Sequence, residues 1–408
     1  MPREPQHRIP SEVYISVFFP NSTGATMRIL ILGADGYLGW PLCMYCSQQG
    51  HEVIGVDNYL RRNMCRELDC EPLVPNPNLA RRVQIWKDAS GKDVKAMVGD
   101  ITDYRLLRGL FEDFRPDGVV HLAEQPSAPY SMIDRERAAT TIHNNLVSTL
   151  NVAYAVRETN PDCQIVKIGT MGEYGTPDID IEEGWIEIEH RGRKDKFLFP
   201  RQASSLYHTT KIQDTDLLWF YVRTWGLRVT DLMQGPVYGI ATEETACDER
   251  LQPNFNYDEV FGTVLNRFVV QAIADYPLTV YGNGSQVRGY LNLIDSLQCL
   301  YLSLTKPADR GELRIFNQIV ETFSVKDLAE KVKEVGEDLG YRVSIDSIKN
   351  PRIEKENHYY NPACTGLLEL GLQPHCLTRE ALADMFRLVE KHRDSINRGA
   401  IYRGVRWN

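Results

Sequence analysis

The chain has no apolar stretch long enough to cross a membrane, no excess of positive charge and no internal repeat. The first absence argues against a membrane protein, because a spanning helix needs about 20 consecutive apolar residues. A net charge of −9 argues against general affinity for nucleic acid, whose phosphates attract basic surfaces. The missing repeat excludes solenoids and propellers. The remaining composition is that of a globular protein with room for a large domain and a smaller lobe.

The sequence also lacks any spacing of cysteine and histidine that is typical of a zinc site. Cys43 and Cys46 do form the pattern Cys-x-x-Cys, but they fall inside an expected helix, where a redox loop is not expected. We interpret them as buried, reduced packing residues. The odd number of cysteines, nine, suits a reducing compartment. We therefore expect no metal and a cytoplasmic location.

Residues 1–26 do not have the character of a targeting segment. The apolar run Val13–Phe19 is too short for a secretory signal, and Glu12 precedes it. A plastid leader would be rich in serine and arginine and poor in acidic residues, which this segment is not. Three alternatives remain open for this leader, namely a disordered segment, an extra strand or an arm on a partner subunit.

From Met27 onwards, short aliphatic runs alternate with helical patterns. Such alternation predicts an α/β fold, a Rossmann-like doubly wound parallel sheet with helices on both faces. We expect a cofactor-binding domain over residues 27–240 and a smaller C-terminal substrate-binding lobe over 241–408, interleaved with late elements of the first. The polar, proline-containing residues 61–92 look like an insertion, and residues 191–193 favour a hairpin turn. The expected strands are 28–32, 52–57, 94–98, 118–122, 164–168 and 228–232, and the expected helices are 38–49, 106–114, 138–158 and 205–225.

A glycine-rich turn, Gly33–Gly39, lies between the first expected strand and helix. Its glycines at 33, 36 and 39 permit a tight turn, and the following helix N-terminus can meet a pyrophosphate. The next strand ends at Asp57, which is positioned to bind the adenosine ribose and to repel a 2′-phosphate. This context predicts dinucleotide binding and favours NAD over NADP. Arg61 and Arg62 point the other way, because nearby arginines can accept that phosphate.

Tyr207 and Lys211 are one helical turn apart, so a phenol and an ammonium share one face of the expected helix. A neighbouring ammonium lowers the pKa of a phenol. We therefore expect Tyr207 to accept a proton from a sugar hydroxyl while a nicotinamide takes the hydride. The alternative is an exposed helical pair without a catalytic role.

The residues Gly33–Gly39, Asp57, Asn145, Thr170 and Tyr207-x-x-x-Lys211 together resemble the extended short-chain dehydrogenase/reductase family of nucleotide-sugar enzymes. The resemblance covers about Met27 to the C-terminus. It implies NAD in the first lobe, a nucleotide sugar in the second and a homodimer formed through long helices. It also implies that Tyr207 is the base, that Lys211 holds the nicotinamide ribose and that Thr170 hydrogen-bonds the sugar. The cofactor-binding residues expected on this basis are Gly33, Asp35, Gly36, Tyr37, Leu38, Gly39, Asp57, Asn58, Arg61, Asp100, Ile101, Leu122, Ala123, Asn145, Tyr207, Lys211, Gln234 and Val237. For Asp100 a helix N-cap is the open alternative.

Within that family, longer stretches are similar to the UDP-sulfoquinovose synthases, which convert UDP-glucose and sulfite to UDP-sulfoquinovose. These stretches are residues 121–125, 127–132, 169–175, 202–205 and 358–361. Members often carry arginine after Glu-Gln, where this chain has Pro126. The implied reaction oxidises C4 of the glucose, eliminates across C5 and C6, adds sulfite at C6 and reduces C4 again.

Elimination needs an acid and a base besides Tyr207. Nucleotide-sugar dehydratases usually carry Asp-Glu after the threonine, whereas this chain has Met171 and Gly172. We expect Glu173 and His208 to share the proton transfers, with Met171 beside them. The open alternatives are a structural turn acid for Glu173 and a helix-surface histidine for His208.

The expected substrate-binding residues are spread over both lobes. Residues 278–290 resemble the family's uridine and diphosphate element, in which Val280 packs on uracil and Arg288 holds phosphate oxygens. The full set is Gln125, Thr170, Tyr207, Gln234, Thr263, Asn266, Arg267, Val280, Arg288, Arg352, Glu356 and Tyr360. Two other functions stay open: a 4-epimerase or 4,6-dehydratase of nucleotide sugars, and a non-catalytic NAD-binding regulatory protein.

Overall fold

The computed structural model describes residues 25–351 and 357–405. Its centre is a seven-stranded sheet in the order β3, β2, β1, β4, β5, β8, β12, in which every pairing is parallel. This order, with the reversal between β1 and β4, is that of a doubly wound fold. The expected fold class is therefore confirmed. The strands are β1 (Arg28–Leu32), β2 (Glu52–Asp57), β3 (Lys95–Val98), β4 (Gly118–His121), β5 (Gln164–Thr170), β8 (Arg228–Gln234) and β12 (Leu313–Gln318).

Both faces of the sheet are buried, which explains why its strands are apolar almost throughout. In β1, Ile29 and Ile31 pack into one hydrophobic core, whereas Leu30 and Leu32 pack into another. Successive side chains of a strand point to opposite faces, so a single aliphatic strand serves both cores.

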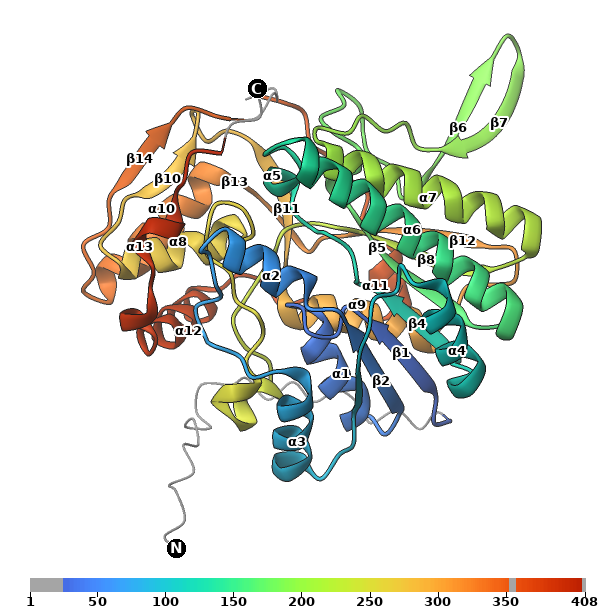
Figure 1. Ribbon diagram of the computed structural model, residues 1–408. Coiled ribbons are helices and arrows are strands. Elements are labelled where there is room, and N and C mark those ends of the chain that lie inside the picture. The colour runs from blue at the N-terminus through green and yellow to red at the C-terminus, as the bar shows by residue number, and fades with distance from the viewer. Residues whose placement is uncertain (1–24, 352–356, 406–408) are drawn as a thin grey trace, which may run out of the picture.

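The two cores are covered by different helices (Figure 1). On the side of Ile29 the core includes side chains of three helices: α1 (Gly39–Gln48), α3 (Leu79–Ser90) and α9 (Leu293–Thr305). On the side of Leu30 it includes side chains of α4 (Tyr104–Phe114), α6 (Arg135–Thr159) and α7 (Leu206–Trp225). Figure 1 shows α6 and α7 running side by side over the sheet.

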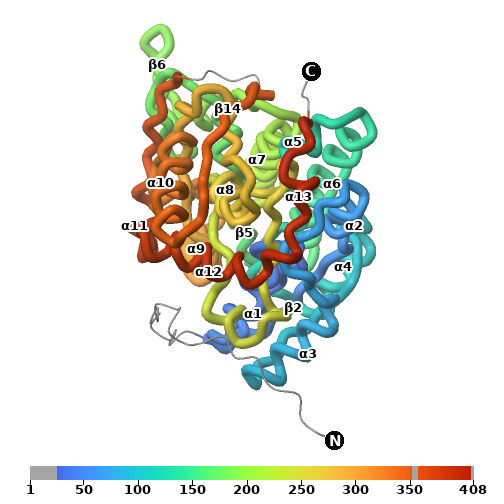
Figure 2. The backbone as a smooth tube through the Cα atoms, turned by 90° about the vertical axis from the view of Figure 1, so that its left-hand side faces the viewer, coloured from blue at the N-terminus to red at the C-terminus, as the bar shows by residue number. Residues whose placement is uncertain are grey.

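A third core belongs to a smaller lobe that follows β8 in the chain. It is built around α8 (Val264–Ile273), α10 (Val325–Asp338) and α12 (Arg379–Glu390), which Figure 2 shows together on one side of the molecule. Two small sheets complete this lobe. The first pairs β10 (Leu278–Tyr281) with β14 (Ile345–Ile348), and the second contains β13 (Glu321–Ser324), β11 (Val287–Asn292) and β9 (Val237–Tyr238). The strand β12 returns from this lobe to the main sheet beside β8.

Two further segments bear on the sequence predictions. Residues 61–92, expected to be an insertion, form two helices, α2 (Leu60–Glu67) and α3. The hairpin expected at residues 191–193 is confirmed by the antiparallel pair β6 (Trp185–His190) and β7 (Arg193–Leu198), which projects from the body in Figure 1. Its turn residues, Arg191 and Gly192, both have positive φ, as tight hairpins require. Short helices complete the chain: α5 (Ala128–Ser131), α11 (Gly366–Leu370) and α13 (Arg398–Ile401).

Cys43 and Cys46 are buried in α1 and are free thiols, as expected. Among the described residues, no helix combines the length and the apolar character needed to cross a bilayer. Within the same residues, no cluster of three or more potential ligands is placed to hold a metal ion.

Candidate active site

A cavity of about 690 Å³ lies where the carboxyl ends of the central strands meet the smaller lobe. Ligands of doubly wound folds bind at this edge of the sheet, because the turns that follow parallel strands converge there. The cavity brings together most of the residues expected from the sequence: Gly33, Gly36, Tyr37, Leu38, Gly39, Asp57, Asn58, Arg61, Ile101, Leu122, Ala123, Gln125, Thr170, Met171, Tyr207, His208, Lys211, Gln234, Val237, Thr263, Asn266, Arg267, Arg288 and Tyr360.

The glycine turn has no room for side chains. Gly33 has a φ of +89°, and a Cβ there would lie 2.7 Å from the backbone carbon of Leu122. A Cβ on Gly39 would lie 2.0 Å from the carbonyl oxygen of Gly33. The backbone at these glycines is thus packed tightly against the residues that follow β4 and against itself. The N-terminus of α1 faces the cavity. These features fit the pyrophosphate of a dinucleotide.

Asp57, at the end of β2, lines the cavity and accepts hydrogen bonds from the amides of Asp35 (2.9 Å) and Tyr59 (2.6 Å). Burial, together with the charge of Asp35, raises the pKa of Asp57 to about 6. Asp35 was expected to bind the cofactor, but its side chain does not line the cavity. It forms ion pairs with Arg62 at 2.6 Å and Arg82 at 3.3 Å, so it anchors the turn from behind. Arg62 is thereby engaged away from the place of a 2′-phosphate.

Two other expected cofactor contacts also lie outside the cavity. Asp100 is exposed and accepts hydrogen bonds from the amide and hydroxyl of Thr102, and the N-cap of α4 is Asp103. Asn145 is fully buried, where its side chain bonds the backbone of Gln125 and the hydroxyl of Thr210. Asn145 therefore fixes the turn after β4 against α7, because its amide can satisfy both a donor and an acceptor there. The neighbouring Asn144 lines the cavity instead.

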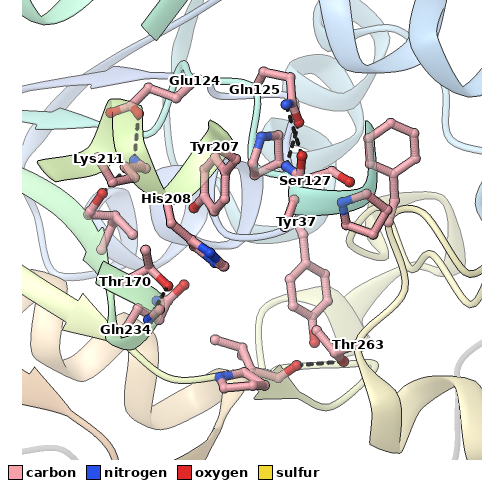
Figure 3. A pocket seen from close by; sticks show the side chains of 18 of the residues that line it. Tyr37, Glu124, Gln125, Ser127, Thr170, Tyr207, His208, Lys211, Gln234 and Thr263 are labelled. Atoms are coloured by element: carbon pink, nitrogen blue, oxygen red, sulfur yellow. Dashed lines mark hydrogen bonds and ion pairs between the residues drawn. The ribbon is translucent and has the colours of Figure 1, made fainter. Parts of the chain in front are cut away.

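Helix α7 places Tyr207 and Lys211 on the face that looks into the cavity (Figure 3). The helix starts at the N-cap Ser205, whose hydroxyl accepts the amide of His208. The amide of Tyr207 donates to the Ser131 hydroxyl at 3.1 Å, which ties this first turn to α5. In Figure 3, Tyr207 and His208 project into the space between Lys211 and Tyr37.

The ammonium of Lys211 is engaged by partners other than Tyr207. It forms an ion pair with Glu124 at 2.6 Å and donates to the carbonyl oxygen of Ile168 at 2.6 Å. The Nζ atom lies 5.8 Å from the centre of the Tyr207 ring. Burial, with the negative charges of Glu124 and Glu173, raises the pKa of the Tyr207 phenol above its ordinary value. In this arrangement the pKa of Tyr207 is raised rather than lowered, chiefly because burial disfavours the charged phenolate.

Of the residues expected to serve elimination, some line the cavity and one does not. Met171 and Thr170 line the cavity, as does His208, whose Nδ1 is within 3.1 Å of the hydroxyls of Ser204 and Ser205. Glu173 does not reach the cavity. Its buried carboxylate accepts the amide of Thr170 at 3.1 Å and completes a capping box. The structure thus favours the open alternative of a structural turn acid for Glu173.

The smaller lobe contributes a polar and basic wall. Arg267 on α8 and Arg288 on β11 both line the cavity, and the Thr263 hydroxyl donates to the carbonyl oxygen of Val237 at 2.9 Å. Val280 was expected to pack on a base, but it is buried in the core of the lobe, while its neighbours Thr279 and Tyr281 line the cavity. The expected residues Arg352 and Glu356 lie outside the described residues.

Several cavity residues had no role in the sequence analysis. Glu124 sits between two residues that were expected, and a charged residue directly after a buried strand is a signal that could have found it. The others lie in loops between strands and helices, where no periodicity marks a single position, although residues 127–132 and 202–205 belong to the stretches that carried the family resemblance. They include Ser127, Gln202, Ser204, Asn254, Asn256, Glu259, Phe261 and Gln286.

Comparison with known proteins places this geometry among nucleotide-sugar enzymes. Residues 29–317 match the model of the NAD dependent epimerase/dehydratase family. A protein named chloroplastic UDP-sulfoquinovose synthase from Spinacia oleracea is 47% identical over 95% of this chain and 80% of its own length. A UDP-sulfoquinovose synthase from Sulfolobus acidocaldarius is 50% identical over 85% of this chain and 88% of its own length.

Solved structures share the fold at lower identity. The UDP-glucose 4-epimerase of Thermotoga maritima, solved with UDP-glucose, is 20% identical with a TM-score of 0.66 and covers 90% of this chain and 99% of its own. The UDP-glucuronic acid 4-epimerase of Bacillus cereus, solved with UDP-glucuronic acid and NAD, has the same identity, TM-score and coverage.

Proposed function

Because the chain belongs to the NAD dependent epimerase/dehydratase family, we propose that it makes UDP-sulfoquinovose from UDP-glucose and sulfite with NAD as its cofactor. The observation that carries this proposal is the similarity, at 47% and 50% identity over most of the chain, to two proteins named UDP-sulfoquinovose synthase. The cavity supports it, since a glycine turn, a tyrosine, a lysine and a threonine converge there. The presence of both Tyr207 and Lys211 in the cavity argues against the alternative of a non-catalytic NAD-binding regulatory protein.

The glycine turn fits the pyrophosphate of NAD, and Asp57 is placed for the adenosine ribose. NAD, when bound, supplies the hydride acceptor for C4 of the sugar and later the hydride donor. The chain's own residues supply the proton transfers. Tyr207, only 8% exposed, takes the proton of the C4 hydroxyl and later returns it, and Thr170 orients the same hydroxyl.

A ketone at C4 makes the hydrogen on C5 acidic, so elimination of the C6 hydroxyl requires a base and an acid near C5 and C6. His208 is the titratable side chain that lines the cavity beside Tyr207, and its ring is 5.2 Å from the Tyr207 ring. We assign both roles to His208, which takes the C5 proton and delivers it to the C6 hydroxyl as that group leaves as water. Bisulfite then adds at C6 and supplies the proton that C5 regains. Met171, with Thr170, forms the apolar and polar floor below the sugar.

The smaller lobe binds the nucleotide. Arg267 and Arg288 are the guanidinium groups on its wall, and a guanidinium holds two phosphate oxygens at once. Thr263, Asn266, Gln234 and Tyr360 line the same region and supply hydrogen-bonding groups to the diphosphate and the sugars. Gln125 also lines the cavity, and its side-chain amide donates to the Ser127 carbonyl oxygen and the Thr141 hydroxyl.

The experiment that tests the function supplies purified protein with UDP-glucose, with and without sulfite, and identifies the products by mass spectrometry. We expect UDP-sulfoquinovose only when sulfite is present. A UDP-hexose with inverted C4, formed without sulfite, would instead establish the 4-epimerase alternative. A stable 4-keto product formed without sulfite would establish the 4,6-dehydratase.

We also propose that the protein is a homodimer formed through α6 and α7. These helices carry exposed apolar side chains, Ile142 at 41% and Phe220 at 50% exposure. Such side chains on neighbouring helices mark a surface whose burial in a dimer is favourable in free energy.

We also propose a cytoplasmic location, which the nine free cysteines support. Recovery of the protein from membranes or an organelle would contradict that location.

Phe220→Asp is expected to convert the dimer to a monomer, because a carboxylate would be buried without a partner in the interface. Sedimentation velocity measures the change directly. Leu339→Asp is the matched control, since Leu339 is exposed to 41% but lies beyond the end of α10 in the other lobe. A monomeric wild-type protein, or dissociation by both variants, would contradict the proposed interface.

A further inference from the structure

A group of buried charges lies behind Tyr207, between the central strands and α7. Its members are Lys167, Lys211, Glu124, Glu173, Asp214 and Asp231, whose side chains are at most 4% exposed. Charges without access to water are costly unless they are paired, so the pairing pattern of this cluster determines where its net charge lies. Lys167 pairs with Asp231 at 3.2 Å, and Lys211 pairs with Glu124 at 2.6 Å.

Glu124 differs from the other acids because it lines the cavity. Figure 3 shows its carboxylate facing the Lys211 ammonium, with Tyr207 beside the pair. The ammonium has three N–H groups, and the Glu124 carboxylate and the Ile168 carbonyl oxygen each lie 2.6 Å from its nitrogen. The position of Lys211 is therefore defined by Glu124 on one side and by the end of β5 on the other.

The charges that surround Glu124 keep it ionised. Burial opposes ionisation, but the charges of Lys211 and Lys167 outweigh it and hold the pKa of Glu124 below its ordinary value. His121 is 3.7 Å away on β4, and burial lowers its pKa to about 4, so it is neutral near pH 7. Asp214 on α7 is also buried, and burial, with the charge of Glu124, raises its pKa well above the ordinary value.

We propose that Glu124 is a positioning residue, which holds the Lys211 ammonium in an ion pair and so controls how much of its positive charge acts on the Tyr207 phenol. This inference rests on the proposed function, because it takes Tyr207 as the group that accepts the sugar proton. It adds a third member to the Tyr207–Lys211 pair. The consequence is that the Tyr207 phenol is protonated in the resting protein and that the charge of the Glu124 carboxylate sets the pKa of this phenol.

The sign of the effect follows from two contributions. A negative charge near a phenol raises its pKa, and a positive charge lowers it. The negative charge of Glu124 raises the pKa of Tyr207 directly. Its ion pair with Lys211 also weakens the lowering of that pKa by the ammonium. Glu124→Gln removes the carboxylate charge and leaves a side chain of the same size, so both contributions change in the direction that lowers the pKa of Tyr207.

The test measures kcat/KM for UDP-glucose against pH at saturating NAD and sulfite. The acidic limb reports the group that must be deprotonated in the free enzyme. Glu124→Gln is expected to move this limb to lower pH by about one unit, so that at a fixed pH on the limb the variant has roughly tenfold more of the active form. Glu244→Gln is the matched control. Glu244 is also a buried glutamate, bonded to Thr242 and away from Lys211, and its substitution should leave the limb in place.

A second measurement separates the role of Glu124 from the reaction. The ultraviolet absorbance of tyrosinate is titrated in the NAD-loaded protein, and the curve of the Tyr207→Phe variant is subtracted to isolate Tyr207. Glu124→Gln should move the difference curve to lower pH, and Glu124→Asp should leave it near that of the wild type. A curve and a limb that stay in place, or that move to higher pH, would overturn the inference.

Failure of the proposed function gives a different pattern. In that case the wild-type protein makes no UDP-sulfoquinovose, whereas the titration of Tyr207 still reports on Glu124. If Glu124→Gln does not fold, Glu124→Ala, which also removes the charge, is titrated in its place. A Tyr207 curve at lower pH supports the inference, and an unchanged curve with only a changed melting temperature overturns it.

Discussion

Tyr207→Phe is expected to lower kcat for UDP-sulfoquinovose formation by about 10²–10⁴-fold, with little change in the affinity for UDP-glucose. The substitution removes only the hydroxyl, which is the group that exchanges a proton with the C4 hydroxyl of the sugar. The ring stays in its buried place on α7, so the fold and the wall of the cavity are retained. Steady-state rates and calorimetric binding of UDP-glucose to the NAD-loaded protein measure the two effects separately.

Tyr221→Phe is the control for this result. Tyr221 lies on the same helix and is also buried, but it stacks on Trp225 with ring centres 3.9 Å apart and does not line the cavity. Loss of its hydroxyl should leave kcat within about twofold of the wild-type value, because the ring of Tyr221 keeps its packing and lies away from the cavity. Equal losses in both variants would mean that the helix, and not the phenol of Tyr207, is what the reaction requires.

Gly33→Ala is expected to abolish tight NAD binding and to destabilise the protein by about 3 kcal/mol or more. Two costs add. A side chain at a φ of +89° costs about 1–2 kcal/mol, and the new methyl group would lie 2.7 Å from the backbone of Leu122, a contact that forces the turn to move. Since the backbone of this turn is what faces the pyrophosphate, its movement should weaken NAD binding at least about tenfold. Fluorescence titration with NAD and thermal unfolding measure both effects.

Gly50→Ala is the control, because it carries the backbone cost without the steric contact. Gly50 has nearly the same φ, +88°, but a Cβ there meets no atom within 4 Å. The control should therefore lose only about 1–2 kcal/mol of stability and retain its affinity for NAD. Equal affinities of the two variants would show that the close approach of Gly33 to Leu122 does not matter for the cofactor.

The local elements of this protein follow from the sequence because each obeys one periodicity or one local signal. The strand Arg28–Leu32 was expected with the bounds that it has, since its aliphatic residues leave no alternative to a buried strand. The helix of Tyr207 and Lys211 was expected within one residue of its start, because Ser205 is a strong N-cap. The hairpin at residues 191–193 was found through its glycine.

Two of the errors concern partners that are far apart in the chain, and two concern residues whose chemical character suits more than one place in the fold. Asp35 faces Arg82, and Asn145 bonds Thr210, which lies 65 positions away. Glu173 was expected to be a catalytic acid, yet its local capping box takes up its carboxylate. Val280 has the apolar character of a base-stacking residue, but apolar character also suits the core in which it lies.

The sequence alone determined the alternating strands and helices of the fold, the dinucleotide turn and the placement of Tyr207 and Lys211 on one helix face, because each of these depends on residues that are close in the chain. Only the tertiary structure decided where the charge of the Lys211 ammonium goes. Glu124 and Lys211 are brought to 2.6 Å by the packing of α7 against the ends of β4 and β5. The energy of two charges in a buried site depends on their distance, and no periodicity records a distance across the fold.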